Sequence, residues 1–367
     1  MGVDIVSLRL QNQHLSSPDF RSPEDVVDYF GAMQAQDFNA AIWSIGLRMR
    51  RSTYDEIESS FNAGKILRTH VMRPTWHFVM PEDIRWMLTL TTPGVKKRLA
   101  PYDRRLDIDQ PFLGKCHQLI RKSLEGGNYL TRGEIGTSLS NGGIEVRGQK
   151  LGHIMVHMEL DGLVCSGPRR GKHMTYALLE EWVAPAKSVT RGQALVKLAL
   201  KYFRSHGPAQ TRDFEWWSGL SLKDASEAVE AIKESLNFVE REHGVYYFIP
   251  NNSVKTDPSR GNILMMSIFD EFSIAYKDRS DINIGRQRDI ENMIGAGNAL
   301  TAVILVNGKA AGSWKRSAKN GGIEVSVSPF RMFTAKEKET VVAEVSRYGR
   351  FLGIPSSLRW TQVHEIS

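Results

Sequence analysis

The chain of 367 residues is 41% hydrophobic and 24% charged, with a formal net charge of +7. This composition is ordinary for a water-soluble protein of about two to four domains, and it excludes collagen-like, disordered and membrane-spanning chains, since the longest aliphatic run covers only residues 302–306. The two cysteines make neither a disulfide framework nor a zinc knuckle and the N-terminus lacks a secretory pattern, so we expect a reduced, cytoplasmic protein whose positive charge favours polyanionic partners.

The first predicted elements are helices that precede a two-stranded ribbon. The sequence Ser22–Asp25 is a strong helix start, because Ser caps the first turn, Pro fits it and acidic side chains favour the positive end of the helix dipole. The expected elements are helices over 23–33, within 34–50 and over 54–63, followed by an extended segment over 66–79. Three helices and a two-stranded ribbon are the outline of a winged helix.

This order of helices followed by a hairpin recurs twice more, which indicates tandem copies of one unit. In each copy a Thr-Arg pair, beginning at Thr131 or Thr211, opens a short helix that the Thr side chain is placed to cap. The other expected elements are helices over 115–124, 149–160, 191–205 and 223–236, and hairpins over 163–179 and 237–249.

From about Val254 the pattern changes to strands separated by turns. Three segments rich in β-branched and aromatic residues follow, with turn signals at Asn307-Gly308 and at 320–322. The sequence Thr334–Glu337 is a capping box that starts a final helix. We predict a small β-rich domain, a partial barrel closed by this helix.

Together these elements predict an α+β fold of four domains. Three tandem winged-helix units are expected at 1–110, 111–187 and 188–253, and a C-terminal β-barrel-like domain with its closing helix at 254–367. The polar stretch 251–261, which contains Pro and Gly, is the best linker candidate.

The helix expected over 149–160 has a polar face that suits DNA. On a helical wheel, Gln149, Lys150, His153 and His157 lie opposite the apolar residues. In a winged helix this element would be the recognition helix, whose Gln and Lys side chains suit base edges and phosphates; a plain solvated face is the alternative. The two histidines are four residues apart, but no third ligand lies nearby in the sequence, so no metal is expected.

Two further segments carry clustered positive charge. These side chains are Arg169, Arg170 and Lys172 at the tip of the 163–179 hairpin, and Arg68, His70, Arg73 and His77 in the extended segment. The hairpin tip predicts a basic wing on the phosphate backbone, with a solubilising turn as the alternative. For the extended segment, DNA contact and buried, hydrogen-bonded histidines both remain open. Trp216-Trp217, which resembles the stacking pair of a single-strand binder, is interpreted as core.

Familiar catalytic patterns are missing from the sequence, which contains no P-loop, no nucleophile elbow and no metalloprotease motif. Asp270 and Glu271 are adjacent in a predicted strand, so their side chains would point to opposite faces and would not converge on one glycosidic bond. Gln34-Ala35-Gln36 at a helix–loop junction is unremarkable on physical grounds, and surface positions are expected for both Gln side chains.

Five segments, taken in order, form a specific combination. They are MQAQDFNAAIWSIGLR, ILRTHVMRPTWHFV, SHGPAQTRDFEWWSGL, IFDEFSIAYKDRS and LVNGKAAGSWKR. Together they resemble the AlkZ/AlkX family of bacterial winged-helix DNA glycosylases, from about residue 8 to beyond residue 350. The resemblance implies three tandem winged-helix units and a C-terminal β-barrel, arranged as a C around a DNA channel.

The resemblance also implies a catalytic motif, Gln-Φ-Gln in the AlkZ branch and Gln-Φ-Asp in the AlkX branch, where Φ is aliphatic. Gln34, Ala35 and Gln36 match the AlkZ branch, whose substrates are N3- and N7-alkylated purines and, in some members, interstrand crosslinks. Housekeeping repair and the self-resistance of producers of DNA-alkylating antibiotics both remain open. We expect a monomer, because three tandem units in one chain fit a protein that wraps around its substrate, and we expect it to act on double-stranded DNA without a cofactor.

The chemistry of these lesions explains why two amides suffice. An N7-alkylated purine is already positively charged and leaves as a neutral base, so no general acid is needed. The enzyme has to place a water molecule beside an oxocarbenium-like sugar, which amide oxygens can do. A monofunctional mechanism follows, because no lysine is implicated as a nucleophile. We expect attack from the groove with the base largely stacked, because a crosslinked base cannot enter a closed pocket.

Two readings without catalysis remain as alternatives. A winged-helix transcriptional regulator is the main one, since this fold is more often regulatory than catalytic, although a regulator usually dimerises on a symmetric operator. An RNA-binding protein is more remote, because aromatic stacking motifs are not evident.

Overall fold

The computed structural model of the protein describes residues 4–250, 263–282, 302–319 and 321–362. Within these ranges the chain forms an α+β fold in which three helical groups each carry a small antiparallel sheet, and a five-stranded sheet follows them. No helix in the described ranges is long and apolar enough to cross a membrane. The expected linker at 251–261 lies outside the described residues.

The first helical group surrounds a sheet of strand order β1-β3-β2. Its elements are α1 (Ile5–Asn12), α2 (Pro23–Phe30), β1 (Ala32–Gln34), α3 (Phe38–Arg48), α4 (Tyr54–Asn62), β2 (Leu67–His70), β3 (Trp76–Val79) and α5 (Pro81–Arg105). Ser22 caps α2 as predicted, but the helix is shorter than expected. It ends at Phe30 because Gly31 adopts a φ of +77° and residues 32–34 pair with β3. Gln34 therefore ends a strand.

The second and third helical groups confirm the predicted hairpins as β5–β6 and β7–β8. The second group comprises α6 (Gln110–Leu124), β4 (Leu130–Thr131), α7 (Arg132–Asn141), α8 (Gly148–Leu160), β5 (Val164–Arg170), β6 (His173–Leu178) and α9 (Leu179–Trp182). The third comprises α10 (Arg191–Ser205), α11 (Thr211–Ser218), α12 (Leu222–Ala231), β7 (Asn237–Arg241) and β8 (Gly244–Phe248). The helix expected over 223–236 ends at Ala231, before a short 3-10 turn.

The C-terminal part forms a five-stranded sheet of order β13-β12-β11-β10-β9, with only β12 and β13 parallel. Its elements are β9 (Ile263–Met265), α13 (Glu271–Ile274), β10 (Val303–Val306), β11 (Lys309–Lys319), β12 (Gly322–Pro329), α15 (Ala335–Leu352) and β13 (Ser356–Trp360). Asn307 and Gly308 both have positive φ, as the predicted turn requires. The capping box of Thr334 and Glu337 is confirmed at the start of α15.

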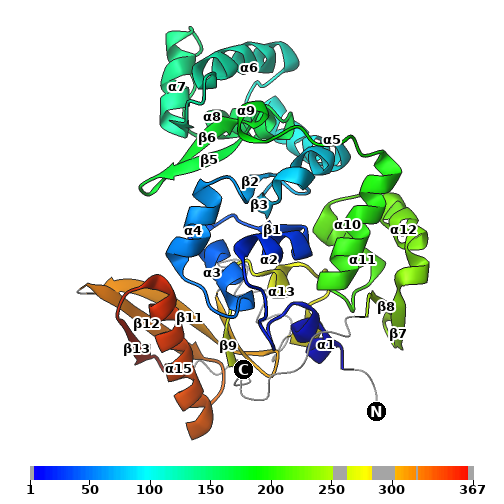
Figure 1. Ribbon diagram of the computed structural model, residues 1–367, viewed down its shortest axis with the longest axis vertical. Helices are drawn as coiled ribbons and strands as arrows, with labels where there is room; N and C mark the ends of the chain where they lie inside the picture. The colour runs from blue at the N-terminus through cyan, green and yellow to red at the C-terminus, as the bar shows by residue number, and fades with distance from the viewer. Residues whose placement is uncertain (1–3, 251–262, 283–301, 320, 363–367) are drawn as a thin grey trace.

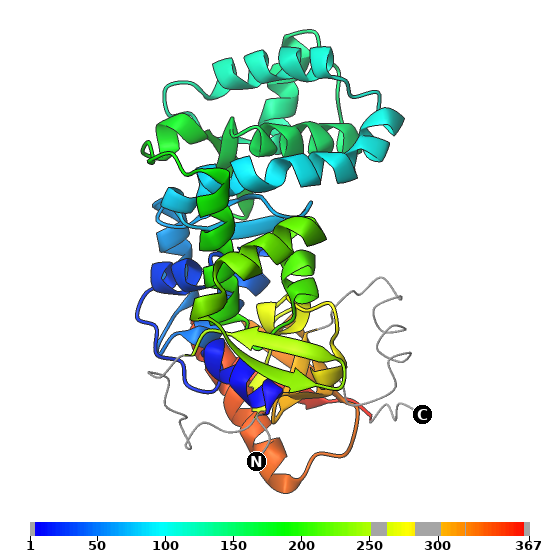
Figure 2. The same cartoon turned by 90° about the vertical axis from the view of Figure 1, so that its right-hand side faces the viewer.

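The parts of the molecule are arranged along one long axis (Figure 1). Helices α6–α8 lie at one end, β1–β3 and α2–α4 in the middle, and β11–β13 with α15 at the other end. Helices α10–α12 and the β7–β8 hairpin flank the middle region and face the viewer in Figure 2. One hydrophobic core joins α2–α4 to the five-stranded sheet and α15, so the first and last of the expected domains are packed as one body.

The acidic pair Asp270-Glu271 does not lie in a strand, which corrects the prediction. Asp270 caps the short helix α13, its carboxylate accepting the backbone N–H of Phe272, and Glu271 is the first helical residue. Both acidic side chains are buried. Asp270 forms a bidentate ion pair with Arg48 of α3, with N–O distances of 2.8 and 2.9 Å, and accepts the Ser44 hydroxyl at 2.5 Å. This pair fastens α13 to α3.

Replacing Asp270 by Ala is expected to lower the free energy of unfolding by about 3–5 kcal/mol, because Arg48 would stay buried without its counter-charge. Urea denaturation measures the change. Glu230→Ala is the control, since it removes only an exposed pair with Lys233 and should leave the free energy of unfolding nearly unchanged. Equally small effects of both substitutions would show that the buried pair does not hold α13 in place.

Buried histidines make the core sensitive to acid. The His77 ring in β3 is fully buried, and its Nδ1 lies 2.9 Å from the carbonyl oxygen of Thr75. Burial, and then the positive charge of Arg73, lowers the pKa of His77 well below its ordinary value of 6.5. Burial is also the main cause of the lowered pKa of His206, which Glu271 opposes. Both rings are therefore neutral in the folded protein near neutral pH.

We expect the free energy of unfolding to fall as the pH drops below 6.5, the ordinary pKa of histidine. Below that pH the unfolded state binds protons that the folded state does not, so each such histidine removes up to about 1.4 kcal/mol per pH unit. Urea denaturation at neutral pH and at about pH 5.5 measures the loss. His77→Gln should reduce it and His173→Gln, at an exposed position, should not. An undiminished loss in His77→Gln would contradict this explanation.

Candidate functional site

The segment Gln34-Ala35-Gln36 leaves the end of β1 but remains hydrogen-bonded beside β3. Gln34 is opposite His77 in the antiparallel register, and the N–H of Ala35 donates to the carbonyl oxygen of Trp76 at 2.7 Å. Ala35 is fully buried, Gln34 is half-buried and Gln36 is exposed. The expected surface position is therefore correct for Gln36 only. The backbone of the segment is fixed, with one buried residue between the two amides.

Hydrogen bonds also fix the two side-chain amides. Arg73 donates from Nη2 to Gln34 Oε1 at 2.9 Å, and the backbone N–H of Trp76 donates to Gln36 Oε1 at 3.3 Å. Because both partners can only donate, they determine which end of each amide carries the oxygen. Each oxygen has a second lone pair, and each nitrogen two N–H groups, with which to bind a ligand or a water molecule.

A buried carboxylate lies directly behind Gln34. Glu271 is 1% exposed, and its Oε1 accepts the backbone N–H of Gln34 at 2.6 Å. Its Oε2 lies 2.9 Å from Trp217 Nε1 and 3.2 Å from His206 Nε2. Three donors from three segments thus compensate the buried charge. No role in the site was predicted for Glu271, because the residue was expected to lie in a strand. The preceding Asp270 is a favoured N-cap residue, which indicates a helix at this position instead.

Arg68 holds the carbonyl groups of the same segment. Its Nε donates to the Ala35 oxygen at 2.9 Å and its Nη2 to the Gln36 oxygen at 3.4 Å. The guanidinium lies 4.3 Å from the centroid of the Trp76 ring, in a cation–π contact. Burial lowers its pKa to about 10, so it stays charged at neutral pH. Arg68 is 6% exposed and bound within the protein, so the predicted DNA contact gives way to a role in holding the Gln segment.

A second buried carboxylate, Glu159 in α8, supports the β2–β3 hairpin. Its Oε2 accepts the backbone N–H of His70 at 2.9 Å and contacts the His70 ring nitrogen Nδ1. Its Oε1 accepts from Trp76 Nε1 at 3.2 Å. His70 and His77 are both buried, which favours the hydrogen-bonded alternative over DNA contact for each of them. Arg73, another of the four basic residues predicted in this segment, lines the same pocket as Gln34.

The polar face of α8 is mostly packed against its neighbours. His157 is 2% exposed, with Nε2 3.0 Å from an Asp103 carboxylate oxygen in α5, which corrects its expected outward position. The His153 ring is half-buried against Tyr102 of α5. Lys150 is half-buried and donates to the carbonyl oxygen of Asp107 at 3.3 Å. Of the four predicted residues, Gln149 alone is exposed.

The basic hairpin tip is divided between packing and exposure. Arg169 forms an ion pair with Glu58 of α4 and donates to the Tyr54 hydroxyl at 2.8 Å, so it docks the hairpin on the first helical group. Arg170 is exposed and donates two hydrogen bonds to the Glu134 carboxylate, at 2.7 and 2.9 Å. Lys172 is exposed at the turn.

Gln34 lines a pocket with a volume of about 370 Å³. Arg73, Arg98, Glu215, Trp216 and Lys277 are among the other lining residues. Trp216 is 44% exposed and was wrongly assigned to the core, whereas its neighbour in the sequence, Trp217, is buried as predicted. The pocket therefore combines an amide, an exposed aromatic ring and several cations, a set that suits a nucleic acid.

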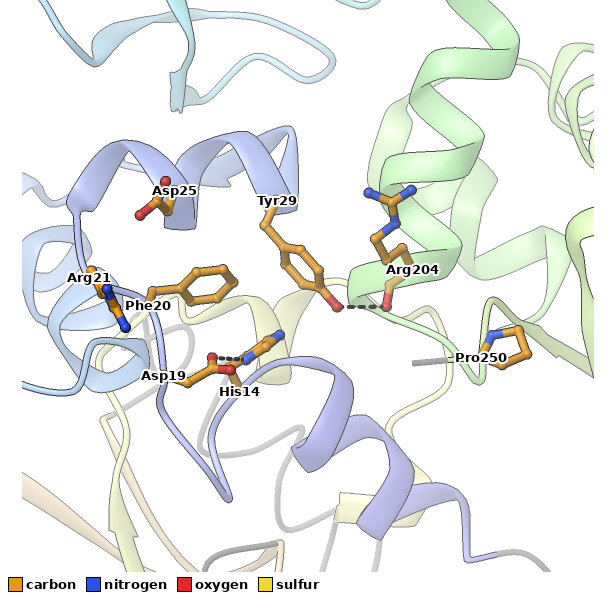
Figure 3. Close-up of a pocket in the computed structure, with 8 residues that line it drawn as sticks. All are labelled: His14, Asp19, Phe20, Arg21, Asp25, Tyr29, Arg204 and Pro250. Carbon is orange, nitrogen blue, oxygen red and sulfur yellow. Dashed lines mark hydrogen bonds and ion pairs between the residues drawn. The ribbon is translucent and has the colours of Figure 1, made fainter. Parts of the chain in front are cut away.

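A second pocket, of about 500 Å³, is lined by residues of the α1–α2 connection, of α2 and of the end of α10, together with Pro250 (Figure 3). Two pairs of its polar groups bond to each other: His14 Nδ1 lies 2.5 Å from Asp19 Oδ1, and the Tyr29 hydroxyl donates to the carbonyl oxygen of Arg204 at 3.1 Å. None of the predicted site residues lines it. Within the described ranges, no group of three or more His, Cys, Asp or Glu side chains is arranged to hold a metal ion. The pocket at Gln34 is the candidate site.

Comparisons with known proteins cover nearly the whole chain. The model of a family described as DNA glycosylase AlkZ-like matches residues 27–351. The chain is similar to the interstrand DNA cross-link repair glycosylase of Streptomyces sahachiroi, with 21% identity over 95% of this chain and 96% of that protein. It is also similar to the solved structure of Streptomyces sahachiroi DNA glycosylase AlkZ, with a TM-score of 0.79 and 19% identity over 98% of this chain and 100% of that one. The resemblance of the sequence is thereby confirmed, and the chain belongs to the AlkZ-like DNA glycosylase family.

Proposed function

We propose that this chain is a monofunctional DNA glycosylase that hydrolyses the N-glycosidic bond of cationic N3- and N7-alkylated purines in double-stranded DNA. The observation that carries the proposal is the pair of hydrogen-bonded amides of Gln34 and Gln36, the first of which lines a pocket. Membership of the family supports base release, and the name of the Streptomyces sahachiroi relative supports interstrand crosslinks as further substrates. The reaction needs water and no cofactor.

In the proposed mechanism a water molecule is the nucleophile. It donates its protons to the second lone pairs of Gln34 Oε1 and Gln36 Oε1, which turns an oxygen lone pair toward C1′ of the sugar. As the glycosidic bond breaks, its electron pair moves to the purine and cancels the positive charge, so the base leaves neutral. The water oxygen bonds to C1′ and one proton passes to solvent. The products are the free alkylated base and an abasic site.

Glu271 supplies negative charge that the two amides lack. Its carboxylate bonds to the backbone of Gln34, so a full charge lies behind the group that positions the water. A fixed charge in a water-excluded interior is screened less than in solvent, and it stabilises the positive charge that develops on the sugar. We infer that Glu271 is a positioning residue that also sets the local field.

The architecture supports a monomer that surrounds DNA. We propose that the three helical groups are winged-helix units at 1–110, 111–187 and 188–253, and that the sheet within 254–367 is a partial barrel, all arranged around a DNA channel. One chain then presents three binding units without dimerising. A cytoplasmic location is proposed with this function.

Among the DNA contacts predicted from the sequence in the second helical group, we keep those whose side chains are exposed: Gln149, Arg170 and Lys172. Gln149 at the start of α8 suits a base edge, and Lys172 at the hairpin tip suits a phosphate. Arg170 is exposed beside Lys172, and a phosphate can replace the carboxylate of Glu134 as its partner.

The protein is expected to release 7-methylguanine from a duplex that carries one such base. Gln34→Ala and Gln36→Ala should each slow release by about 100-fold, because each removes one of the acceptors that hold the water. The double variant should lose little more, since both amides act on one molecule. Single-turnover release of the base is the measurement, and Gln118→Ala, at an exposed position on α6, is the matched control.

Release that survives both substitutions would reject the glutamine pair. Binding without release, on a methylated and on a crosslinked duplex, would favour a DNA-binding protein without catalysis. A uracil-containing duplex tests the requirement for a cationic base. Negligible uracil release is expected, because a neutral leaving group needs the proton that this site does not supply.

Glu271→Gln is expected to keep the shape of the site and remove its buried charge. The release rate at saturating enzyme should fall by about tenfold or more, while the half-saturating concentration changes little, because the charge acts on the transition state. Thermal unfolding of the variant shows whether it is folded, and Glu234→Gln, at an exposed position, is the control. A folded variant that works at the wild-type rate would leave the carboxylate with a structural role only.

A further inference from the structure

Trp216 presents a fixed aromatic ring to the pocket beside Gln34. The residue is 44% exposed, yet its Nε1 donates to the carbonyl oxygen of Ile274 at 3.0 Å. The guanidinium of Arg279 lies 6.0 Å from the ring centroid. The hydrogen bond anchors one edge of the indole and Arg279 lies over its ring, while 44% of the residue remains exposed. An anchored, exposed ring that lines a pocket is a stacking surface for another planar ring.

The positive charges around the pocket differ in their freedom to bind a ligand. Arg98 donates from Nη2 to the carbonyl oxygens of Met72 and Gly219, at 3.1 and 2.9 Å, so it braces the pocket wall. Lys277 is exposed, and its ammonium forms no ion pair within the described part of the chain. An unpaired ammonium next to a stacking surface suits the phosphate of the same nucleotide.

We propose that this pocket is a nucleotide subsite in which a planar ring of the lesion stacks on Trp216 and an adjacent phosphate binds Lys277. The inference rests on the proposed function, because it places the sugar between these two groups, at Gln34. A cationic alkylpurine is attracted to the electron-rich face of indole, whereas a neutral purine gains stacking alone. Glu215 lines the same pocket, and its carboxylate offsets part of the positive charge of Arg73, Arg98 and Lys277 there. Trp216 therefore selects charged lesions over ordinary bases.

The planar ring has two possible sources. A methylated purine carries no other ring, so the modified base itself has to turn out of the helix to reach Trp216. A bulky adduct can instead place an aromatic substituent in the pocket while its base stays stacked, as the sequence led us to expect for groove attack. Both sources share the chemistry that Trp216 recognises, and two lesions distinguish them.

The experiment compares binding to a lesion duplex and to the same duplex without the lesion. The lesion is 7-methyl-2′-fluorodeoxyguanosine, whose fluorine slows base loss. Trp216→Ala should lower the preference for the lesion by about tenfold or more, and Trp216→Phe should retain most of it. Phe238→Ala removes a side chain of similar type, 62% exposed on β7 and outside the pocket, and should change nothing. Lys277→Ala should weaken binding to both duplexes by the same factor and reduce the salt dependence of that binding.

A second lesion duplex carries an N7 adduct with an aromatic substituent. Loss of preference in Trp216→Ala with both lesions identifies the ring as the base, and loss with the aromatic adduct alone identifies it as the substituent. A Trp216→Ala protein that retains the wild-type preference for both lesions overturns the subsite, as does a wild type without preference.

Base release from hydrolysable duplexes separates this inference from the proposed function. Release by the wild type, with no effect of Trp216→Ala on binding or rate, overturns the subsite and leaves the glycosylase in place. Lesion binding that depends on Trp216, without release of the base, supports the subsite and overturns the glycosylase.

Discussion

The hydrogen bond from the backbone N–H of Gln34 to the carboxylate of Glu271, 2.6 Å long, is the contact on which the candidate site depends. It joins residues 237 positions apart, and the same carboxylate binds Trp217 and His206 of the third helical group. An ionised carboxylate is costly to bury unless its donors are in place. Strand β1, helices α10 and α11, and helix α13 must therefore pack together before Gln34 takes its position.

The second helical group contributes through the other buried carboxylate, Glu159, which binds His70 and Trp76. The backbone N–H of Trp76 in turn donates to Gln36. Glu271 therefore holds the Gln34 end of the segment 34–36, and Glu159 supports its Gln36 end through Trp76. Rotating any part away would leave a buried carboxylate without its donors, which makes opening of the molecule at this point unfavourable. DNA bound at the proposed site would therefore reach Gln34 from the pocket side. The rigidity of this segment suits the proposed task of placing one water molecule.

Signals within a few residues predicted much of the fold, whereas partners distant in the sequence decided the rest. The caps at Ser22 and Thr334 depend on the next three residues and were predicted correctly. Residues 32 and 33 were expected to end a helix, but they pair with β3 as a strand. In the site, the sequence shows that Arg68 is charged but not that it is buried. Trp216 was likewise assigned to the core. Its exposure depends on the pocket, which segments distant in the sequence form together.

The placement of charge connects the fold with the proposed specificity. A carboxylate facing the substrate would bind a cationic lesion strongly in the ground state, and attraction shared by ground and transition states does not accelerate the reaction. In this chain the charge of Glu271 lies behind a backbone amide, and Gln34 offers a neutral oxygen in its place. Neither Gln34 nor Gln36 can protonate a departing base. Because only a purine that is already cationic leaves without that proton, the proposed choice of substrate agrees with the residue types at the candidate site.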